Sequence, residues 1–451
     1  MGPSIKDYDY YKNRRFDPII WFLFILCIKG LLFIADTLAW LCFSHSVLKG
    51  SKKEQELSKS YEHSAHIMNI YSRGTINLFG NHDETNFLCL HDRYVHPNYI
   101  LEHDNVMLMG VDDKRAYFCI SDETIDPCHS STGPFLWANT FIAARKIVIL
   151  DINHFHRLAE IRGDPFEKDH LNVTIIHMTT RCGSTLLGQV LERVPRTKVM
   201  SEPKPFAYVA NMYMTGKISY AEYQHLLEST FRIQCKKEKG IDPIVMEWVP
   251  FASPTIPFLK EKYPDINLIF NTRNLKETHG SIKKGALFGS IMPFSMQLIT
   301  VFNIIFFPLE RHIPIHYDDI KWWKIYRNNR LSFDEDVERA KFLFFNWWGA
   351  IEMYRKMKEK YLTTILFDDL IADPKKEIEY LFDVLSISRE YLDHATEALK
   401  SDSQQGVFGK RGLGKIKDES EALGKLDAVF RQFDVPFSSD GSLEQLRELL
   451  K

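Results

Sequence analysis

Arg181, Gly183, Ser184 and Thr185 stand together in NVTIIHMTTRCGSTLLGQVLERV, residues 172–194. A guanidinium can hold two oxygens of one anion, and neighbouring hydroxyls can donate further hydrogen bonds. The glycine lets the backbone approach a ligand closely. The β-branched residues before this group predict a strand, and the leucines after it predict a helix that begins at Ser184. Because the first N–H groups of a helix lack intrahelical partners and carry the positive dipole end, the pattern predicts a phosphate site.

This group differs from an ordinary nucleotide-binding loop. That loop ends in Gly-Lys-Ser/Thr, where the lysine spans the β- and γ-phosphates and the hydroxyl holds magnesium. Residues 180–187 read TRCGSTLL and contain no lysine. The sequence therefore favours a ligand whose single 5′-phosphate carries a transferable group. The alternative is a plain strand-to-helix turn in which Ser184 caps the helix.

Residues 180–187 resemble the 5′-phosphosulfate loop of the sulfotransferases. The Arg-Ser-Gly-Thr/Ser-Thr-Leu variant of the tyrosylprotein and carbohydrate sulfotransferases is the nearer match. Two later stretches fit the family in the expected order. NTRNLKETHGS places Ser281 eight residues after Arg273, as in the 3′-phosphate signature, and ILFDDLIADPKKEIEYLF matches the late acidic-pair and Asp-Pro stretch. The resemblance covers about Val173 to Phe382.

The resemblance implies transfer of a sulfuryl group from 3′-phosphoadenosine 5′-phosphosulfate (PAPS) to an acceptor hydroxyl or amine, without a metal. Arg273 and Ser281 would hold the 3′-phosphate, and Arg181 would neutralise charge on the leaving phosphate oxygen. Lys410 and Arg411, in QQGVFGKRGLGKI, would belong to the loop that covers the adenine and 3′-phosphate. The residues expected in the 5′-phosphate loop are Arg181, Cys182, Gly183, Ser184, Thr185 and Leu186.

A hydroxyl acceptor loses a proton during transfer, so the site needs a carboxylate or a histidine as base. Glu202 lies 21 residues after Arg181, and the tyrosylprotein sulfotransferases place their catalytic glutamate at a similar distance. Glu202 is therefore the candidate base, unless it only pairs with Arg181 or caps the turn. His177, expected within the strand, and His279, beside the 3′-phosphate signature, are alternatives.

Cys182 lies beside the predicted helix start, a position that favours a thiolate. One interpretation is redox control of the loop. The other is that a small residue is simply tolerated there. The remaining cysteines and the histidines lack the spacing of a metal site, so no metal is expected.

Strand patterns alternate with helix patterns from Val173 onward, which predicts an α/β fold with a central parallel sheet between helical layers. The resemblance makes this a three-layer, P-loop NTPase-like sulfotransferase fold. A long helix is expected from about Asp334 to Lys360, with Ser332 and Glu335 as capping box and an aromatic face toward the core. Residues 72–169 read as irregular with a few strands, most clearly KIVILDI at residues 146–152.

Residues 19–43, IIWFLFILCIKGLLFIADTLAWLCF, are long enough to cross a bilayer. Lys29 and Asp36 oppose insertion by about 2.5–3.5 kcal/mol each, whereas each Leu, Ile or Phe contributes about 0.3–0.6 kcal/mol. Because Lys29 and Asp36 share one helical face, a helix lying in the membrane interface competes with the spanning helix that we favour. A short tail before this segment and a polar stem after it resemble a type II Golgi enzyme, so we expect a Golgi membrane location.

The expected organisation follows from these patterns. It comprises an N-terminal tail (1–18), the apolar segment (19–43), a stem (44–71), an accessory region (72–169), a catalytic domain (170–435) and a C-terminal tail (436–451). A second apolar stretch, residues 285–309, is expected to form a buried helix or an apolar wall of the acceptor site, and contact with the membrane interface is an option.

The formal net charge of −2 gives no general affinity for nucleic acid. A membrane-anchored, PAPS-dependent sulfotransferase is the leading hypothesis, with a glycan, lipid or tyrosine peptide as acceptor and carbohydrate favoured. A catalytically inactive, nucleotide-binding relative is the second hypothesis. An atypical kinase that uses ATP and magnesium is the third.

Overall fold

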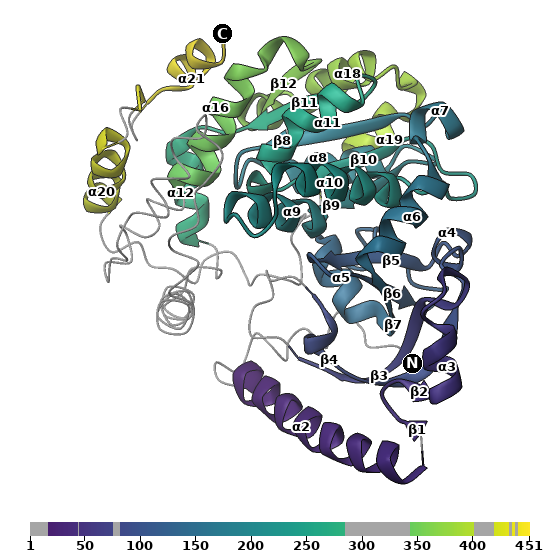
Figure 1. The fold of residues 1–451 in the computed structure, drawn as a ribbon. Coiled ribbons are helices and arrows are strands. Elements are labelled where there is room, and N and C mark those ends of the chain that lie inside the picture. Colours follow the sequence, from purple (N-terminus) through teal and green to yellow (C-terminus); the bar gives the residue numbers. More distant parts are fainter. Residues whose placement is uncertain are drawn as a thin grey trace. The chain divides into compact units, whose positions relative to one another are not determined.

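The computed structural model describes residues 17–43, 45–74, 82–284, 343–400, 419–432, 435–437 and 441–451. The chain forms two compact units (Figure 1). The first unit comprises Met1–Leu171, Met200–Val209 and Ile218–Ile244. The second comprises Asn172–Val199, Ala210–Lys217 and Val245–Lys451.

A five-stranded parallel sheet forms the centre of the second unit, as the alternation of strand and helix patterns predicts. All six residues of β8 and all five of β10 are buried, because strands of such a sheet are covered on both faces. The spatial order is β12–β11–β8–β10–β9. The strands are β8 (Val173–Met178), β9 (Lys198–Ser201), β10 (Ile244–Trp248), β11 (Asn267–Thr272) and β12 (Thr363–Leu366).

Helices pack on both faces of this sheet and give the unit three layers. Neighbouring residues of a strand point to opposite faces, so Ile269 and Phe270 of β11 belong to two different apolar clusters. The cluster around Ile269 includes side chains of α8 (Ser184–Glu192), α18 (Pro374–Val384) and α19 (Leu392–Thr396). The cluster around Phe270 includes side chains of α16 (Gly349–Lys356), α20 (Glu419–Gln432) and α21 (Leu443–Leu450). The predicted α/β class is confirmed.

The long helix predicted between Asp334 and Lys360 is described from Leu343 onward. Its described part contains a π-helical turn, Phe344–Trp348, continues as α16 and ends at Lys356. The proposed capping box, Ser332 and Glu335, lies outside the described residues. Trp348 is buried in the core, as expected for the aromatic face.

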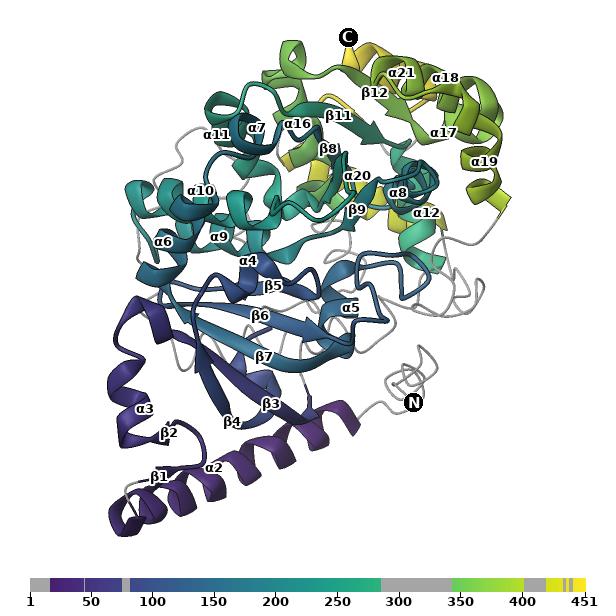
Figure 2. The same ribbon diagram turned by 90° about the vertical axis from the view of Figure 1, so that its right-hand side faces the viewer.

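A five-stranded antiparallel sheet forms the first unit, where the sequence suggested an irregular region. Its order is β4–β3–β7–β6–β5. The middle strand, β7, contains the KIVILD part of the predicted strand, and the next residue, Ile152, begins α6. The strands are β3 (Ala65–Arg73), β4 (Phe87–Val95), β5 (Val106–Val111), β6 (Arg115–Ser121) and β7 (Ala144–Asp151). Figure 2 shows this sheet from the side.

The remaining elements connect or flank the two sheets. They are α2 (Asp17–Phe43), β1 (His45–Ser46), β2 (Gly50–Ser51), α3 (Lys52–Leu57), α4 (Tyr99–Glu102), α5 (Leu136–Ala143), α6 (Ile152–Arg162), α7 (Pro165–Asp169), α9 (Lys204–Met214), α10 (Tyr220–Gln234), α11 (Ile256–Lys262), α12 (Leu275–Lys284) and α17 (Phe367–Ala372). Short 3-10 turns lie at Tyr61–His63, Glu84–Asn86, Pro250–Thr255, Lys358–Lys360, Arg389–Tyr391 and Glu397–Lys400.

Candidate functional site

The loop between β8 and α8 has the form that the sequence predicts, with the helix beginning at Ser184. Gly183 is the N-cap residue and has φ of 81°, a left-handed conformation that favours glycine. A Cβ atom at Gly183 would also lie only 2.1 Å from the ring of Phe367. Glycine is therefore required at this position for two independent reasons. The first N–H groups of α8 point toward the loop, where an anion would be favoured.

Arg181 lies in the same loop and also has a left-handed backbone, with φ of 57°. Its Nε donates a hydrogen bond of 3.1 Å to Oγ of Ser281 on α12. Arg181 comes from the predicted 5′-phosphate loop, and Ser281 comes from the predicted 3′-phosphate signature. The structure thus brings residues of these two motifs into direct contact.

Arg273 follows directly after β11, and its side chain is 20% exposed. Its guanidinium lies over the ring of Phe367, 4.6 Å from the centroid, and its Nη2 lies 3.3 Å from Glu277 Oε2. Trp347 donates a hydrogen bond of 2.9 Å to the Arg273 carbonyl and fixes the backbone. The buried Arg273 Nε has no hydrogen-bond partner among the described residues. A buried donor without a partner indicates a place for an anion.

Phe367 contacts both predicted phosphate sites, a role that no sequence pattern predicted. Its ring lies against Gly183 of the loop and under the guanidinium of Arg273. It is the first residue of α17 and follows β12 directly, within the ILFDDL stretch. The stretch resembles a family signature, but no pattern in it predicts that its phenylalanine contacts both sites.

The three segments meet at one end of the sheet. Strands β12, β11 and β8 are neighbours, and Phe367, Arg273 and the loop each follow the carboxyl end of one of them. The connection after β8 leads to α8 on one face, and the connection after β11 leads to α12, whose Leu275 packs on the other face. Adjacent strands whose connections leave to opposite faces mark the usual ligand position of an open α/β sheet.

A hydrogen bond between Thr185 and a buried glutamate supports the loop. Thr185 Oγ1 donates a hydrogen bond of 3.1 Å to Oε1 of Glu247, a fully buried carboxylate on β10. Glu247 was not predicted, because nothing in IVMEW distinguishes a loop-supporting glutamate from an ordinary strand residue. Leu186 is 8% exposed, so its side chain is buried within the unit.

Cys182 differs from the thiolate that the sequence suggested. Its Sγ donates a hydrogen bond of 2.7 Å to Asn271 Oδ1, and the side chain is fully buried. Burial raises the pKa of the Cys182 thiol to about 12, which outweighs the attraction of the helix start. A neutral, inaccessible thiol is a packing residue, so the redox interpretation is wrong.

Glu202, the candidate base, belongs to the first unit and follows directly after β9 with a left-handed φ of 55°. Its Oε2 accepts a hydrogen bond of 3.0 Å from Trp137 Nε1 and lies 3.9 Å from Lys204 Nζ. Burial lowers the pKa of Lys204, and the negative charge of Glu202 partly offsets this effect. These contacts hold the carboxylate in a defined position. Its catalytic role stays a prediction.

His177 is a core residue rather than a base. Its Nδ1 is 2.7 Å from Tyr361 Oη, and its Nε2 is 2.9 Å from Ser253 Oγ, so both ring nitrogens are engaged. Burial lowers the pKa of His177 to about 3. His279, the other alternative, is 2% exposed on α12. Burial of both histidines leaves Glu202 as the preferred candidate.

Several predicted features lie outside the described residues. They are Lys410, Arg411 and the apolar stretch 285–309. Within the described ranges no group of three or more His, Cys, Asp or Glu side chains is placed to hold a metal ion.

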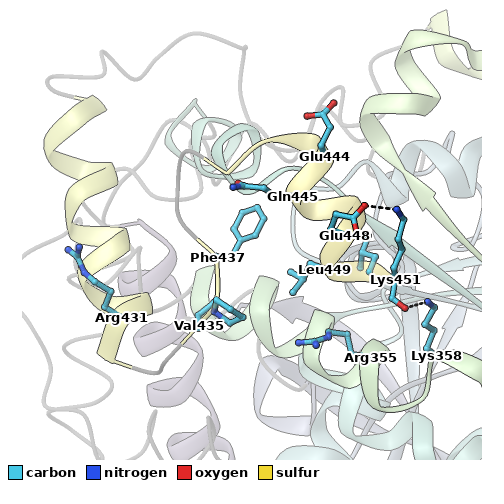
Figure 3. Close-up of a pocket in the computed structure, with 12 residues that line it drawn as sticks. Arg355, Lys358, Arg431, Val435, Phe437, Glu444, Gln445, Glu448, Leu449 and Lys451 are labelled. Atoms are coloured by element: carbon cyan, nitrogen blue, oxygen red, sulfur yellow. Dashed lines mark hydrogen bonds and ion pairs between the residues drawn. The ribbon is translucent and has the colours of Figure 1, made fainter.

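A hollow of about 950 Å³ lies beside α21 in the second unit. Figure 3 shows residues that line it, among them Phe437, Leu449 of α21, Arg355 of α16 and Arg431 of α20. Of the predicted PAPS-binding residues that lie in the described part of the chain, none lines this hollow. It is therefore distinct from the site at the carboxyl ends of β8, β11 and β12.

No protein-family model matches the sequence, and no curated protein matches it. Solved structures that match this one include three sulfotransferases, each with a low TM-score and low sequence identity. Sulfotransferase STF9 from Mycobacterium avium gives a TM-score of 0.34 and 8% identity, with 63% of this chain and 82% of that chain covered. A sulfotransferase from Alicyclobacillus acidocaldarius gives a TM-score of 0.26 and 15% identity, with 58% of this chain and 96% of that chain covered. Sulfotransferase STF1 from Mycobacterium tuberculosis H37Rv gives a TM-score of 0.28 and 10% identity, with 61% of this chain and 84% of that chain covered.

Proposed function

We propose that this protein is a PAPS-dependent sulfotransferase. The observation that supports this most strongly is the hydrogen bond between Arg181 and Ser281, which joins the two predicted phosphate motifs. Arg273, held by Phe367, adds a second cation at the same end of the sheet. Two anion-binding groups this close together suit a nucleotide that carries one phosphate at each side of its ribose.

The roles of the residues follow from their chemistry. The start of α8 would bind the 5′-phosphate through the N–H groups of Ser184 and Thr185 and through the Ser184 hydroxyl, while the Thr185 hydroxyl donates to Glu247. Arg273 and Ser281 would bind the 3′-phosphate, and Arg273 Nε, which has no partner within the described ranges, would donate to one of its oxygens. Arg181 would neutralise the charge that develops on the oxygen between sulfur and the 5′-phosphate.

In the proposed reaction an acceptor oxygen attacks sulfur, and the bond between sulfur and the bridging phosphate oxygen breaks. The acceptor proton passes to Glu202, and 3′-phosphoadenosine 5′-phosphate leaves with the electron pair of the broken bond. The hydrogen bond from Trp137 fixes the carboxylate that accepts the proton. A positioned base of this kind contributes roughly 10²–10⁴-fold to rate.

The acceptor and the location complete the proposal. A carbohydrate hydroxyl is the favoured acceptor, with lipid and tyrosine hydroxyls as the other classes. A Golgi membrane is the proposed location, and the N-terminal apolar helix supports attachment to a membrane.

The test is incubation of the full chain with ³⁵S-labelled PAPS and separate panels of glycans, tyrosine peptides and lipids, with and without a metal chelator. The proposal expects label transfer to one class, unaffected by the chelator. Transfer of phosphate from labelled ATP, dependent on magnesium, would instead indicate the kinase hypothesis. Binding of 3′-phosphoadenosine 5′-phosphate without transfer to any panel would indicate the inactive relative.

A further inference from the structure

Helix α2 has one face against the first unit and a broad apolar face exposed. In the described part of the chain it is the one helix long and apolar enough to cross a membrane, over Leu23–Cys42. Figure 2 shows it along the side of the first unit that contains β3 and β4. The contacts of its charged side chains distinguish a helix that spans the membrane from one that lies in the membrane plane.

The polar face of α2 is turned toward the first unit. Ile25 is 1% exposed and Asp36 is 9% exposed, and Lys29 lies between them at helical spacing. Lys29 Nζ donates a hydrogen bond to the Glu84 carbonyl. Asp36 accepts hydrogen bonds of 2.8 Å from Ser46 Oγ and 3.2 Å from the Leu48 N–H. The two charged residues at the centre of the helix are thus bound within the protein.

Over Leu23–Phe43, the part of α2 whose side chains the structure describes, the opposite face carries no charged residue. Its large side chains are strongly exposed, with Leu41 at 74%, Leu31 at 68% and Phe33 at 67%. The other exposed members are Leu23, Phe24, Leu26, Ile34 and Leu38. The hydroxyl of Thr37 donates to the Phe33 carbonyl at 2.8 Å, so even this polar group needs no water. A continuous exposed face of this kind marks an interaction surface.

We infer that α2 lies in the plane of a membrane and inserts this apolar face into one leaflet of a phospholipid bilayer. Basic residues flank the helix on both sides, which suits anionic headgroups. They are Lys12, Arg14 and Arg15 before it, and Lys49, Lys52 and Lys53 after it. Lys52 and Lys53 are exposed at the start of α3. This inference does not depend on the proposed catalytic function, but it replaces the spanning type II arrangement from which the Golgi location was expected.

A spanning arrangement would break the contacts that hold α2. Lys29 and Asp36 lie near the middle of the helix, so crossing the bilayer would withdraw both from Glu84 and Ser46 and place two charges in hydrocarbon. The in-plane arrangement keeps these contacts. It also places the N-terminal tail and both units on the same side of the membrane, unlike a type II anchor.

Topology in sealed vesicles tests the inference directly. The full chain, tagged at both termini, is synthesised with sealed membrane vesicles and treated with protease, and a lumenal marker reports vesicle integrity. We expect the protein to float with the vesicles and both tags to be digested together or protected together. Protection of only one tag would overturn the inference, as would failure to float.

Substitutions on the two faces provide a second test with phosphatidylcholine vesicles that contain phosphatidylserine. Leu31→Glu with Leu38→Glu should lower the floated fraction at least tenfold, because both side chains face lipid. Leu57→Glu is the matched control, since Leu57 is 45% exposed on α3 of the same unit. Unchanged flotation of the double variant would contradict the lipid contact. Lys29→Leu with Asp36→Leu should produce a fraction with one tag protected, and an unchanged topology would contradict the role assigned to these two residues.

Discussion

Arg181 donates a hydrogen bond of 3.1 Å to Ser281, although 100 residues separate them in the chain. The contact is possible because β8 and β11 are adjacent parallel strands, so the loop after β8 lies near α12, the helix that follows β11. A basic side chain and a hydroxyl from two different motifs are thereby placed at one end of the sheet. The proposed PAPS site rests on this juxtaposition.

Gly183→Ala should disrupt the loop. An alanine with φ near 81° costs about 1–2 kcal/mol, and its Cβ would overlap the Phe367 ring. We expect a lower melting temperature and strongly reduced affinity for 3′-phosphoadenosine 5′-phosphate, measured by calorimetry. Gly424→Ala is the control, because a Cβ there meets nothing within 4 Å and the position is helical. The control variant should be as stable as wild type, or more stable by up to about 1 kcal/mol. Equal stability and nucleotide affinity of the two variants would contradict the loop geometry.

Phe367→Ala should weaken nucleotide binding by removing the surface on which Arg273 lies. A cation–π contact contributes about 0.5–2 kcal/mol, which corresponds to roughly 2- to 30-fold in affinity. Phe367→Tyr retains the ring and should restore most of the affinity. If both variants bind 3′-phosphoadenosine 5′-phosphate like wild type, Phe367 does not position Arg273.

Glu202→Gln should remove most turnover and leave nucleotide binding near normal. The amide cannot accept the acceptor proton, and loss of a positioned base lowers the rate roughly 10²–10⁴-fold. The measurement is sulfuryl transfer from labelled PAPS alongside the calorimetric titration. Glu160→Gln, an exposed substitution on α6 of the same unit, is the control. Full activity of Glu202→Gln would end its assignment as the base.

Acid should destabilise the protein in part through His177. Burial lowers the pKa of His177 from 6.5 to about 3, so between these values the unfolded chain binds a proton that the folded chain does not. Stability is therefore complete above pH 6.5 and falls as the pH decreases, by about 1.4 kcal/mol per pH unit for this group. His177→Gln should show a smaller fall in melting temperature from pH 7 to pH 5 than wild type. The exposed His63→Gln serves as control, and equal falls in all three proteins would contradict the role of His177.

Local patterns in the sequence predicted the features that depend on neighbouring residues. The helix start at Ser184 follows from small polar residues before a Leu-rich face, and the central strand β7 follows from its continuous apolar run. The α/β class follows from alternating strand and helix patterns. These signals are short in range and each is read from one segment.

Contacts between distant segments were not predictable in the same way. The position of Phe367 between Gly183 and Arg273 depends on the pairing of β12, β11 and β8, which the sequence does not specify. The protonation state of Cys182 depends on burial of its thiol beside Asn271, and this effect outweighs the local effect of the helix start. The antiparallel sheet of the first unit was underestimated because β3 and β4 contain histidine, asparagine and aspartate that suggest loops.

The most direct test of the account is calorimetric titration of the full chain with 3′-phosphoadenosine 5′-phosphate, compared among wild type, Arg181→Ala and Arg273→Ala. Charge-assisted hydrogen bonds contribute about 1.5–3 kcal/mol each, so each substitution should weaken binding by roughly 10- to 150-fold. Arg389→Ala, a substitution at an exposed ion pair, should bind like wild type. Absence of saturable binding by the wild type, or equal affinity of all four proteins, would contradict the proposed site.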